Sequence, residues 1–294
     1  MGVTAAVLVA AVVAGLAATL VSISRHVNVD PIDTTAEERW LIHRLARLPR
    51  VAAFVKRRLD PTVTGGLVLT ASLAVISGAT LGVALLLDMV HQQRGLAALD
   101  EGVARWGRDH ADHLAVSVLR VVTDLGGTPV VTAVLVVVGS VHLLWRREPH
   151  VPLFLATVGV GVVLTNNVLK VLIDRDRPSV GPLVGFSGSS FPSGHSATAA
   201  ACWAAVALVV GRGRSRPVRA LLAGTAALVA TAVAASRALL GVHWLTDVIS
   251  GLVVGWAWFL VVAIAFGGRR QRLGHPVERL DDAIDAIDAD VDAA

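Results

Sequence analysis

Long hydrophobic runs dominate this chain, and charged residues gather in the segments between them. Residues 2–24 and 65–87 carry no charged side chain, and further runs cover about 125–144, 151–169, 192–211, 220–236 and 248–268. A helix needs roughly 20 apolar residues to cross the hydrocarbon core of a bilayer. Strands of a membrane barrel would instead alternate apolar and polar positions over about ten residues. Because these runs do not alternate, they predict seven membrane-spanning helices.

The composition fits an integral membrane protein. Of the 294 residues, 54% are hydrophobic and 16% are charged, and the mean hydropathy is +0.68. A typical soluble domain is about one quarter charged. Cys202 is the only cysteine, which excludes an intrachain disulfide. The fold class is therefore predicted to be an all-α integral membrane protein, and the net charge of +4 is assigned to its loops rather than to nucleic-acid binding.

The first run, residues 2–24, has two interpretations. A secretory signal peptide would begin with a basic region and continue with a shorter apolar stretch. This run has no basic residue before it and is longer than such a stretch. We therefore expect a retained N-terminal transmembrane helix.

The distribution of basic residues orients the helices. If seven helices alternate across the membrane, one side receives the segment 25–64, the turn 145–150, the loop 211–219 and the C-terminal tail. These segments hold 18 of the chain's 26 Lys and Arg residues. Loops rich in Lys and Arg stay in the cytoplasm. The loops 88–124, 170–195 and 237–247 are therefore expected to face outward.

Four parts of the chain are expected. Residues 1–24 form the N-terminal transmembrane helix, 25–64 a basic amphipathic cytoplasmic segment, 65–268 the main helical core, and 269–294 a charged cytoplasmic tail. The segment 25–64 combines an apolar face with arginines, which is typical of a helix that lies on anionic headgroups. The tail combines one apolar stripe with six Asp residues, as in a solvated, partly ordered segment.

Three polar stretches stand at the ends of the later spans: KVLIDRDRP from Lys170, FPSGHS from Phe191 and SRALLGVHWLTD from Ser236. Each has an ordinary structural interpretation. Basic residues at helix ends reach toward lipid headgroups, a Pro-Ser-Gly turn often caps a helix, and a His beside a Trp is common at a membrane interface. However, the predicted topology places all three at the same outward face. Ionisable groups that cluster in a bundle indicate a functional site.

Helical spacing brings some of these residues together. Lys170 and Arg177 are seven residues apart, so both would lie on one face if the fourth helix continued for two turns. His243 and Asp247 are four residues apart and are expected to share a face at the start of the seventh helix.

The residue types favour a phosphate ligand. Lys170, Arg177 and Arg237 supply positive charge, and arginine presents a fork of donors that matches phosphoryl oxygens. Ser193 and the amides of Ser193 and Gly194 are expected at a helix N-terminus, where the helix dipole favours anions. The ligand would be a tetrahedral oxyanion, most simply phosphate.

The same site can carry out phosphoryl transfer. His243 is placed to attack phosphorus, and Asp247 can accept its other N–H and fix the tautomer. His195, on the opposing helix end, can protonate the leaving oxygen. Because the cations neutralise the developing charge, we predict a phosphohistidine intermediate, with neither a metal ion nor a cofactor.

These residues resemble the signature of the type 2 phosphatidic acid phosphatases, relatives of the vanadium haloperoxidases. The family signature reads Lys-x6-Arg-Pro, then Pro-Ser-Gly-His, then Ser-Arg-x5-His-x3-Asp, and the chain matches all three parts in order. The resemblance covers about residues 65–268 and implies a six-helix phosphatase core. It implies His243 as nucleophile, Asp247 as its orienting partner and His195 as general acid. The phosphate ligands that it implies are Lys170, Arg177, Ser193, Gly194 and Arg237.

The resemblance also implies lipid phosphates and lipid diphosphates as substrates. We expect removal of a terminal phosphate from a membrane lipid at the outer leaflet of a bacterial cytoplasmic membrane. A polyprenyl diphosphate is the first choice, because an outward site suits the recycling of a carrier lipid. Phosphatidic acid and phosphatidylglycerol phosphate fit the residues equally well. The sequence names no protein partner.

Three other functions stay open. A haloperoxidase would hold vanadate in the same anion site, although seven spans and no visible soluble domain argue against it. A lipid phosphotransferase would use a lipid alcohol in place of water. An anion transporter would need polar residues along several spans, and these are sparse apart from Thr165, Asn166 and Asn167.

The stretch VVTDLGGTP precedes the third span. Asp124 stands at the outward face and could touch a substrate there. A helix that starts at Thr123 or Asp124 is the favoured interpretation, because both residue types cap helices well.

Overall fold

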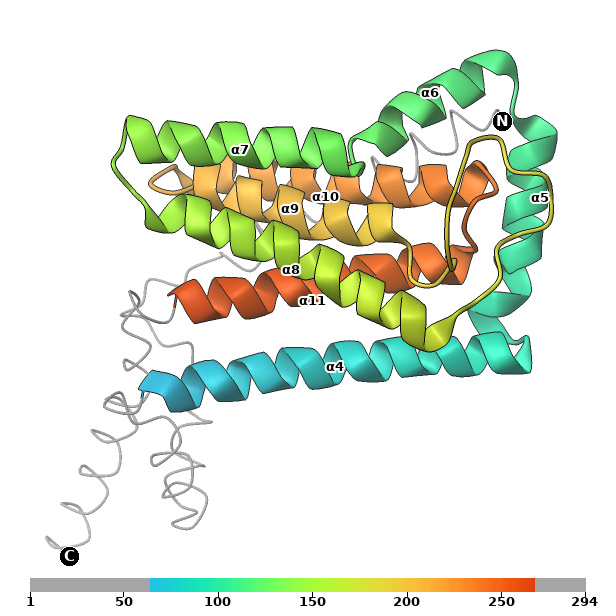
Figure 1. Ribbon diagram of the computed structural model, residues 1–294, viewed down its shortest axis with the longest axis horizontal. Helices are drawn as coiled ribbons and strands as arrows, with labels where there is room; N and C mark the ends of the chain where they lie inside the picture. The colour runs from blue at the N-terminus through green and yellow to red at the C-terminus, as the bar shows by residue number, and fades with distance from the viewer. Residues whose placement is uncertain (1–63, 268–294) are drawn as a thin grey trace, which may run out of the picture. The chain divides into compact units, whose positions relative to one another are not determined.

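The computed structural model describes residues 64–267, and the regular secondary structure in this range is helical (Figure 1). The elements are α4 (Thr64–Gln92), the 3-10 helix η2 (Gly95–Leu99), α5 (Asp100–His110), α6 (His113–Asp124), α7 (Thr128–Leu144), α8 (His150–Ile173), α9 (Gly194–Val210), α10 (Arg216–Leu239) and α11 (Leu245–Gly267). The predicted helix 2–24, the basic segment and the acidic tail lie outside the described residues.

The contacts divide the chain into two units. The described residues 75–263 belong to one compact unit, which contains α5 to α10 and most of α4 and α11. The described residues 64–74 and 264–267 belong to the other unit. The functional residues considered below all lie in the first unit.

The helices confirm a membrane protein made of α-helices. Four of them, α4, α8, α10 and α11, are long and apolar enough to cross a membrane, and the bent pair α6–α7 is a fifth candidate. α9 is apolar but has only 17 residues. Over the described range the structure therefore contains four or five candidate spans where the hydrophobic pattern predicted six.

The stretch VVTDLGGTP forms a break between two helices. α6 starts after Asp112, whose side chain accepts a hydrogen bond at 2.7 Å from the backbone amide three residues later. α6 ends at Asp124, and α7 follows Gly127 with Pro129 in its first turn, at an angle of 44° to α6. The expectation that Thr123 or Asp124 starts the third helix is therefore wrong. Asp112 caps α6, whereas α7 begins at Thr128 after Gly127, with Pro129 in its first turn and no side-chain cap.

Small residues hold the centre of the bundle. Most of α9 is buried, chiefly through alanines, and it packs against α7, α8 and α10. On α11, a Cβ added at Gly255 would collide with the carbonyl oxygen of Ala197, and one added at Gly251 would lie 2.5 Å from that of Ser193. Small residues let helix backbones approach this closely inside membranes. This packing fixes the start of α9 beside the start of α11.

The helix ends that carry the three polar stretches gather at one end of the bundle, on the right of Figure 1. α8 and α10 end there, α9 and α11 start there, and α5 and α6 lie across the same end. Arg108 of α5 donates to the carbonyls of Val180 and Gly181, and Arg120 of α6 donates to that of Leu183 at 2.9 Å. These bonds hold the loop 174–193 over the end of the bundle. The three stretches therefore meet at one face, as predicted.

Candidate active site

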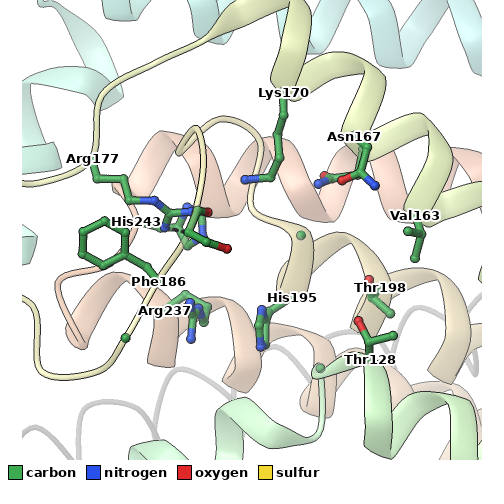
Figure 2. Close-up of a pocket in the computed structure, with 15 residues that line it drawn as sticks. Thr128, Val163, Asn167, Lys170, Arg177, Phe186, His195, Thr198, Arg237 and His243 are labelled. Carbon is green, nitrogen blue, oxygen red and sulfur yellow. Dashed lines mark hydrogen bonds between the residues drawn. The ribbon is translucent and has the colours of Figure 1, made fainter.

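A cavity of about 520 Å³ opens at this end of the bundle (Figure 2). The side chains of Lys170, Arg177, His195, Arg237 and His243 point toward its centre. The other residues that line it are Gly126, Thr128, Val163, Asn166, Asn167, Gly185, Phe186, Ser187, Gly194 and Thr198. Six of the eight predicted site residues thus line one cavity, while Ser193 and Asp247 do not reach its surface.

His243 and Asp247 form a buried pair at the start of α11. Asp247 Oδ2 accepts a hydrogen bond from the amide of Trp244 at 2.9 Å and lies 3.5 Å from His243 Nδ1. This separation is too long for a hydrogen bond, and Nδ1 has no other partner within the described part of the chain. The other ring nitrogen, Nε2, lies 3.3 Å from Nη1 of Arg177. The imidazole therefore presents one nitrogen to the carboxylate and the other to a cation of the cavity.

Burial sets the protonation state of His243. Its side chain is almost wholly enclosed, and this burial lowers its pKa from the ordinary 6.5 to about 4. The Asp247 carboxylate acts in the opposite direction, and Arg177 and Arg237 lower the pKa further. The imidazole is therefore neutral at pH 7. With the proton on Nδ1, beside the carboxylate, Nε2 is unprotonated and its lone pair faces Nη1 of Arg177.

The loop 174–193 fixes two of the cations. Arg177 donates hydrogen bonds of 2.6 to 2.9 Å to the carbonyls of Ser187, Gly188 and Val242. Lys170, near the end of α8, donates to the carbonyl of Ser189. The prediction that Lys170 and Arg177 share a helical face is wrong, because α8 ends at Ile173 and Asp174 takes a left-handed conformation (φ 41°). The loop instead folds back and brings Arg177 over the cavity.

Arg237 is the cation that lies deepest among the packed helices. Its side chain is buried near the end of α10, and its Nη1 donates to Thr123 Oγ1 at 3.3 Å. Its Nε has no hydrogen-bond partner among the residues that the structure describes. A buried donor without a partner is costly unless a ligand satisfies it. Arg237 thus offers the cavity a donor that is already in place for an anion.

His195 faces the cavity from the first turn of α9 (Figure 2). Its backbone is supported by the junction between α6 and α7. A Cβ added at Gly126 would lie 2.7 Å from the carbonyl oxygen of His195 and 2.5 Å from Val233. Only glycine permits this approach, so the junction holds the start of α9 in place.

Ser193 and Gly194 begin α9 as predicted, but they face different surroundings. Ser193 is buried, its amide donates to the carbonyl of Asp247 at 3.0 Å, and its Oγ accepts a hydrogen bond from Ser196 at 3.0 Å. The prediction that the Ser193 amide faces the anion is therefore wrong, because this donor ties α9 to α11. Gly194 lines the cavity and leaves the helix N-terminus open to a ligand.

Comparison with known proteins identifies the family. The sequence pattern of the PAP2 superfamily matches residues 149–271, which include all three polar stretches. Phosphatidylglycerophosphatase B of Bacillus subtilis (strain 168) is 33% identical over 150 residues, covering 49% of this chain and 72% of that protein. The chain belongs to the PAP2 superfamily. It is accordingly a multi-pass membrane phosphatase.

A solved PAP2 structure has the same fold. The first transmembrane PAP2-type phosphatidylglycerolphosphate phosphatase from Bacillus subtilis gives a TM-score of 0.62 over 69% of this chain and 98% of that chain, with 27% sequence identity. A second relative, lipid A 1-phosphatase of Rhizobium johnstonii, is 39% identical over 127 residues, covering 39% of this chain and 46% of that protein. The chain thus spans about half the length of the second relative.

The cavity around His243 is also lined by residues that could not be assigned to a site from the sequence. Asn166 is buried on α8, and its Oδ1 has no hydrogen-bond partner in the described range. A polar residue within an apolar span was the available signal for it. No such signal marks Thr128, Thr198 or Phe186. Threonines near a helix start and apolar residues in a loop are common in proteins and need no functional explanation.

Proposed function

We propose that this PAP2 phosphatase removes the terminal phosphate from a membrane lipid phosphate or diphosphate through a phosphohistidine at His243. One observation carries the proposal: the ring of His243 lies in a cavity with three cationic side chains. Burial lowers the pKa of this ring, which favours the neutral imidazole. Positive charge binds and neutralises the phosphate oxygens, and the unprotonated nitrogen can form a bond to phosphorus.

In the first step, Nε2 of His243 attacks phosphorus while the bond from phosphorus to the leaving oxygen breaks. Asp247 stabilises the positive charge that develops on the imidazole. His195 donates a proton to the leaving oxygen. Lys170, Arg177 and Arg237 hold the non-bridging oxygens, and Gly194 contributes at the N-terminus of α9.

In the second step, water attacks the phosphorus of the phosphohistidine. His195 accepts a proton from this water, and the bond between phosphorus and nitrogen breaks. Inorganic phosphate leaves and His243 returns to its neutral form. A lipid alcohol in place of water would give phosphotransfer at the same site. Since the side-chain cations neutralise the charge, the mechanism uses neither a metal ion nor a cofactor.

An apolar groove between α7 and α8 supports a lipid substrate. This second cavity, also about 520 Å³, shares Thr128, Val163 and Thr198 with the cavity around His243, which we call the phosphate cavity. It follows α7 from Thr128 to Leu143 and is lined mainly by aliphatic side chains of both helices. A lipid whose phosphate is bound near His243 can therefore place a hydrocarbon chain in this groove.

A polyprenyl diphosphate is the proposed substrate at the outer face of the membrane. The orientation is supported by the excess of basic residues in the loops at the other side. The groove between α7 and α8 can take one hydrocarbon chain, as a polyprenyl lipid would require. The main alternative is phosphatidylglycerol phosphate, which the name of the Bacillus relative supports.

Purified protein in detergent is expected to release phosphate from a lipid phosphate in the presence of EDTA. The substrates to compare are a polyprenyl diphosphate, phosphatidylglycerol phosphate and phosphatidic acid, and the polyprenyl diphosphate should be turned over fastest. Loss of activity in EDTA that returns with a divalent cation would contradict the metal-free reaction. Transfer of the phosphate to a lipid alcohol would identify a phosphotransferase. Uptake of phosphate into vesicles without hydrolysis would identify a transporter.

Filling the groove should impair lipid turnover and spare a small substrate. Ala156→Trp on α8 introduces a large side chain into the groove. We expect kcat/KM for a long-chain lipid phosphate to fall about tenfold, or roughly 1.4 kcal/mol, with no change for p-nitrophenyl phosphate. The matched control is Leu153→Trp, an exposed position on the same helix outside the groove. Equal losses with both substrates would refute the role of the groove.

A further inference from the structure

A buried cluster lies behind His243 and Asp247, and the proposed reaction does not use it. Its members are Asp100 at the start of α5, Arg175 in the loop between α8 and α9, and Thr246 on α11. None of the three lines the phosphate cavity. The side chains of Arg175 and Asp100 are 14% and 6% exposed, so the charges face each other rather than water.

One guanidinium bridges two carboxylates in this cluster. Nη1 of Arg175 donates to Asp247 Oδ1 at 2.6 Å, and Nη2 donates to Asp100 Oδ2 at 2.8 Å. The guanidinium also lies 5.4 Å from the ring centre of Trp244. The planar fork of arginine is suited to two acceptors held at fixed positions, which a lysine cannot satisfy together.

Asp100 is anchored to the same turn of α11. Its Oδ1 accepts a hydrogen bond from the amide of Thr246 at 2.9 Å, and its Oδ2 accepts one from the Thr246 hydroxyl at 2.7 Å. That hydroxyl in turn accepts a bond from Nη1 of Arg175 at 2.7 Å. The cluster therefore ties α5, the loop and the first turn of α11 together next to Asp247.

We propose that Asp100 and Arg175 are positioning residues that hold the Asp247 carboxylate toward His243. This inference rests on the proposed roles of His243 and Asp247. Arg175 occupies Oδ1 of Asp247, so Oδ2 is the oxygen that faces Nδ1 of His243. A rotation of the carboxylate away from His243 would break the contact with Arg175. Partners behind a functional group often set its orientation in this way.

Asp100 also affects the net charge of the groups next to His243. The carboxylates of Asp100 and Asp247 share the Arg175 guanidinium, so these three groups together keep a net negative charge. His243 becomes cationic when Nε2 carries the phosphoryl group and Nδ1 carries a proton, and negative charge nearby stabilises that state. Without the charge of Asp100, Arg175 would neutralise Asp247 more fully and this stabilisation would weaken.

The test is Asp100→Asn in the full-length protein, assayed with the lipid phosphate that the wild type hydrolyses. We expect kcat to fall about 10- to 100-fold, with KM unchanged because Asp100 does not touch the substrate. The matched control is Asp109→Asn, an exposed position on the same helix. It should keep the kcat of the wild type. A kcat for Asp100→Asn equal to that of this control would overturn the proposal.

A double-mutant cycle separates positioning from a purely structural role. If Asp100 acts through Asp247, Asp100→Asn should cost less than about twofold in a protein that already carries Asp247→Asn. A structural role would give the same loss in both backgrounds and would overturn the proposal.

Arg175→Lys should retain more activity than Arg175→Met, because one point charge can still reach one carboxylate. If Asp100→Asn and Arg175→Met do not fold, Arg175→Lys tests the positioning role instead. Its kcat should fall and its KM should stay unchanged.

Wild type and His243→Ala distinguish this inference from the proposed function. If the wild type is active, His243→Ala is inactive and Asp100→Asn behaves as the control, the positioning role is overturned and the proposed function stands. If His243→Ala keeps its activity, the proposed function fails and the positioning role fails with it. Melting temperature and elution volume show for each variant that the comparison is between folded proteins.

Discussion

Replacement of His243 by alanine is expected to lower kcat for phosphate release by at least about 10⁴-fold, a loss typical of a missing nucleophile. Nε2 of His243 is the nitrogen that would bond to phosphorus, and alanine supplies no substitute. The measurement is phosphate release by purified protein. Wild type that is mixed briefly with labelled lipid phosphate and denatured in alkali should retain label, whereas the alanine variant should not.

His113→Ala is the matched control for this substitution. His113 is an exposed residue at the start of α6 at the same end of the bundle, and it does not line the cavity. Its replacement should leave turnover unchanged. Turnover near the wild-type rate in His243→Ala would remove this residue from the mechanism. Label retained by that variant would place the phosphoryl group on another residue.

Asp247→Asn should lower kcat by about 10³- to 10⁴-fold with little change in KM, by analogy with the orienting carboxylate of a catalytic triad. The substitution preserves size but removes the negative charge that raises the pKa of His243 against the effect of burial. His243 then becomes less basic, and its cationic form loses its counter-charge. Steady-state kinetics with the same lipid phosphate measure both constants.

The control for Asp247→Asn is Asp174→Asn. Asp174 is exposed, lies in the loop at the same end of the bundle and has a left-handed conformation that asparagine tolerates. This variant should match the wild type. If Asp247→Asn were as active as the control, Asp247 would serve only as a helix cap through its bond with the amide of Trp244.

Local spacing predicted the parts of the site that lie on one turn of chain. His243 and Asp247 are four residues apart, and the structure pairs them as expected. Lys170 and Arg177 also reach the same cavity, but the predicted reason for it was wrong. Periodicity assumes that a helix continues, and the left-handed residue that ends α8 cannot be recognised from spacing alone.

Contacts between distant segments could not be predicted from the sequence. Asp100 precedes Arg175 by 75 positions, and no local pattern marks it as a partner. The amide of Ser193 also finds its acceptor on another helix, the carbonyl of Asp247. Both contacts depend on how α5, α9 and α11 pack, and this packing is set by small residues whose role appears only in three dimensions. The helices themselves could be predicted, because each hydrophobic run is a local property of the sequence.

The short length of α9 has a consequence for how the enzyme meets its substrate. α9 has 17 residues, whereas its neighbours α8 and α10 have 24. At 1.5 Å per residue the difference is about 10 Å, and Figure 1 shows α9 starting inward of the ends of these neighbours. The start of α9, which carries His195, is therefore recessed from the ends of α8 and α10. With the proposed lipid substrate, we expect this recess to let the lipid reach His195 by lateral diffusion within the bilayer. Turnover should then follow the mole fraction of substrate in the membrane rather than its amount per volume of water.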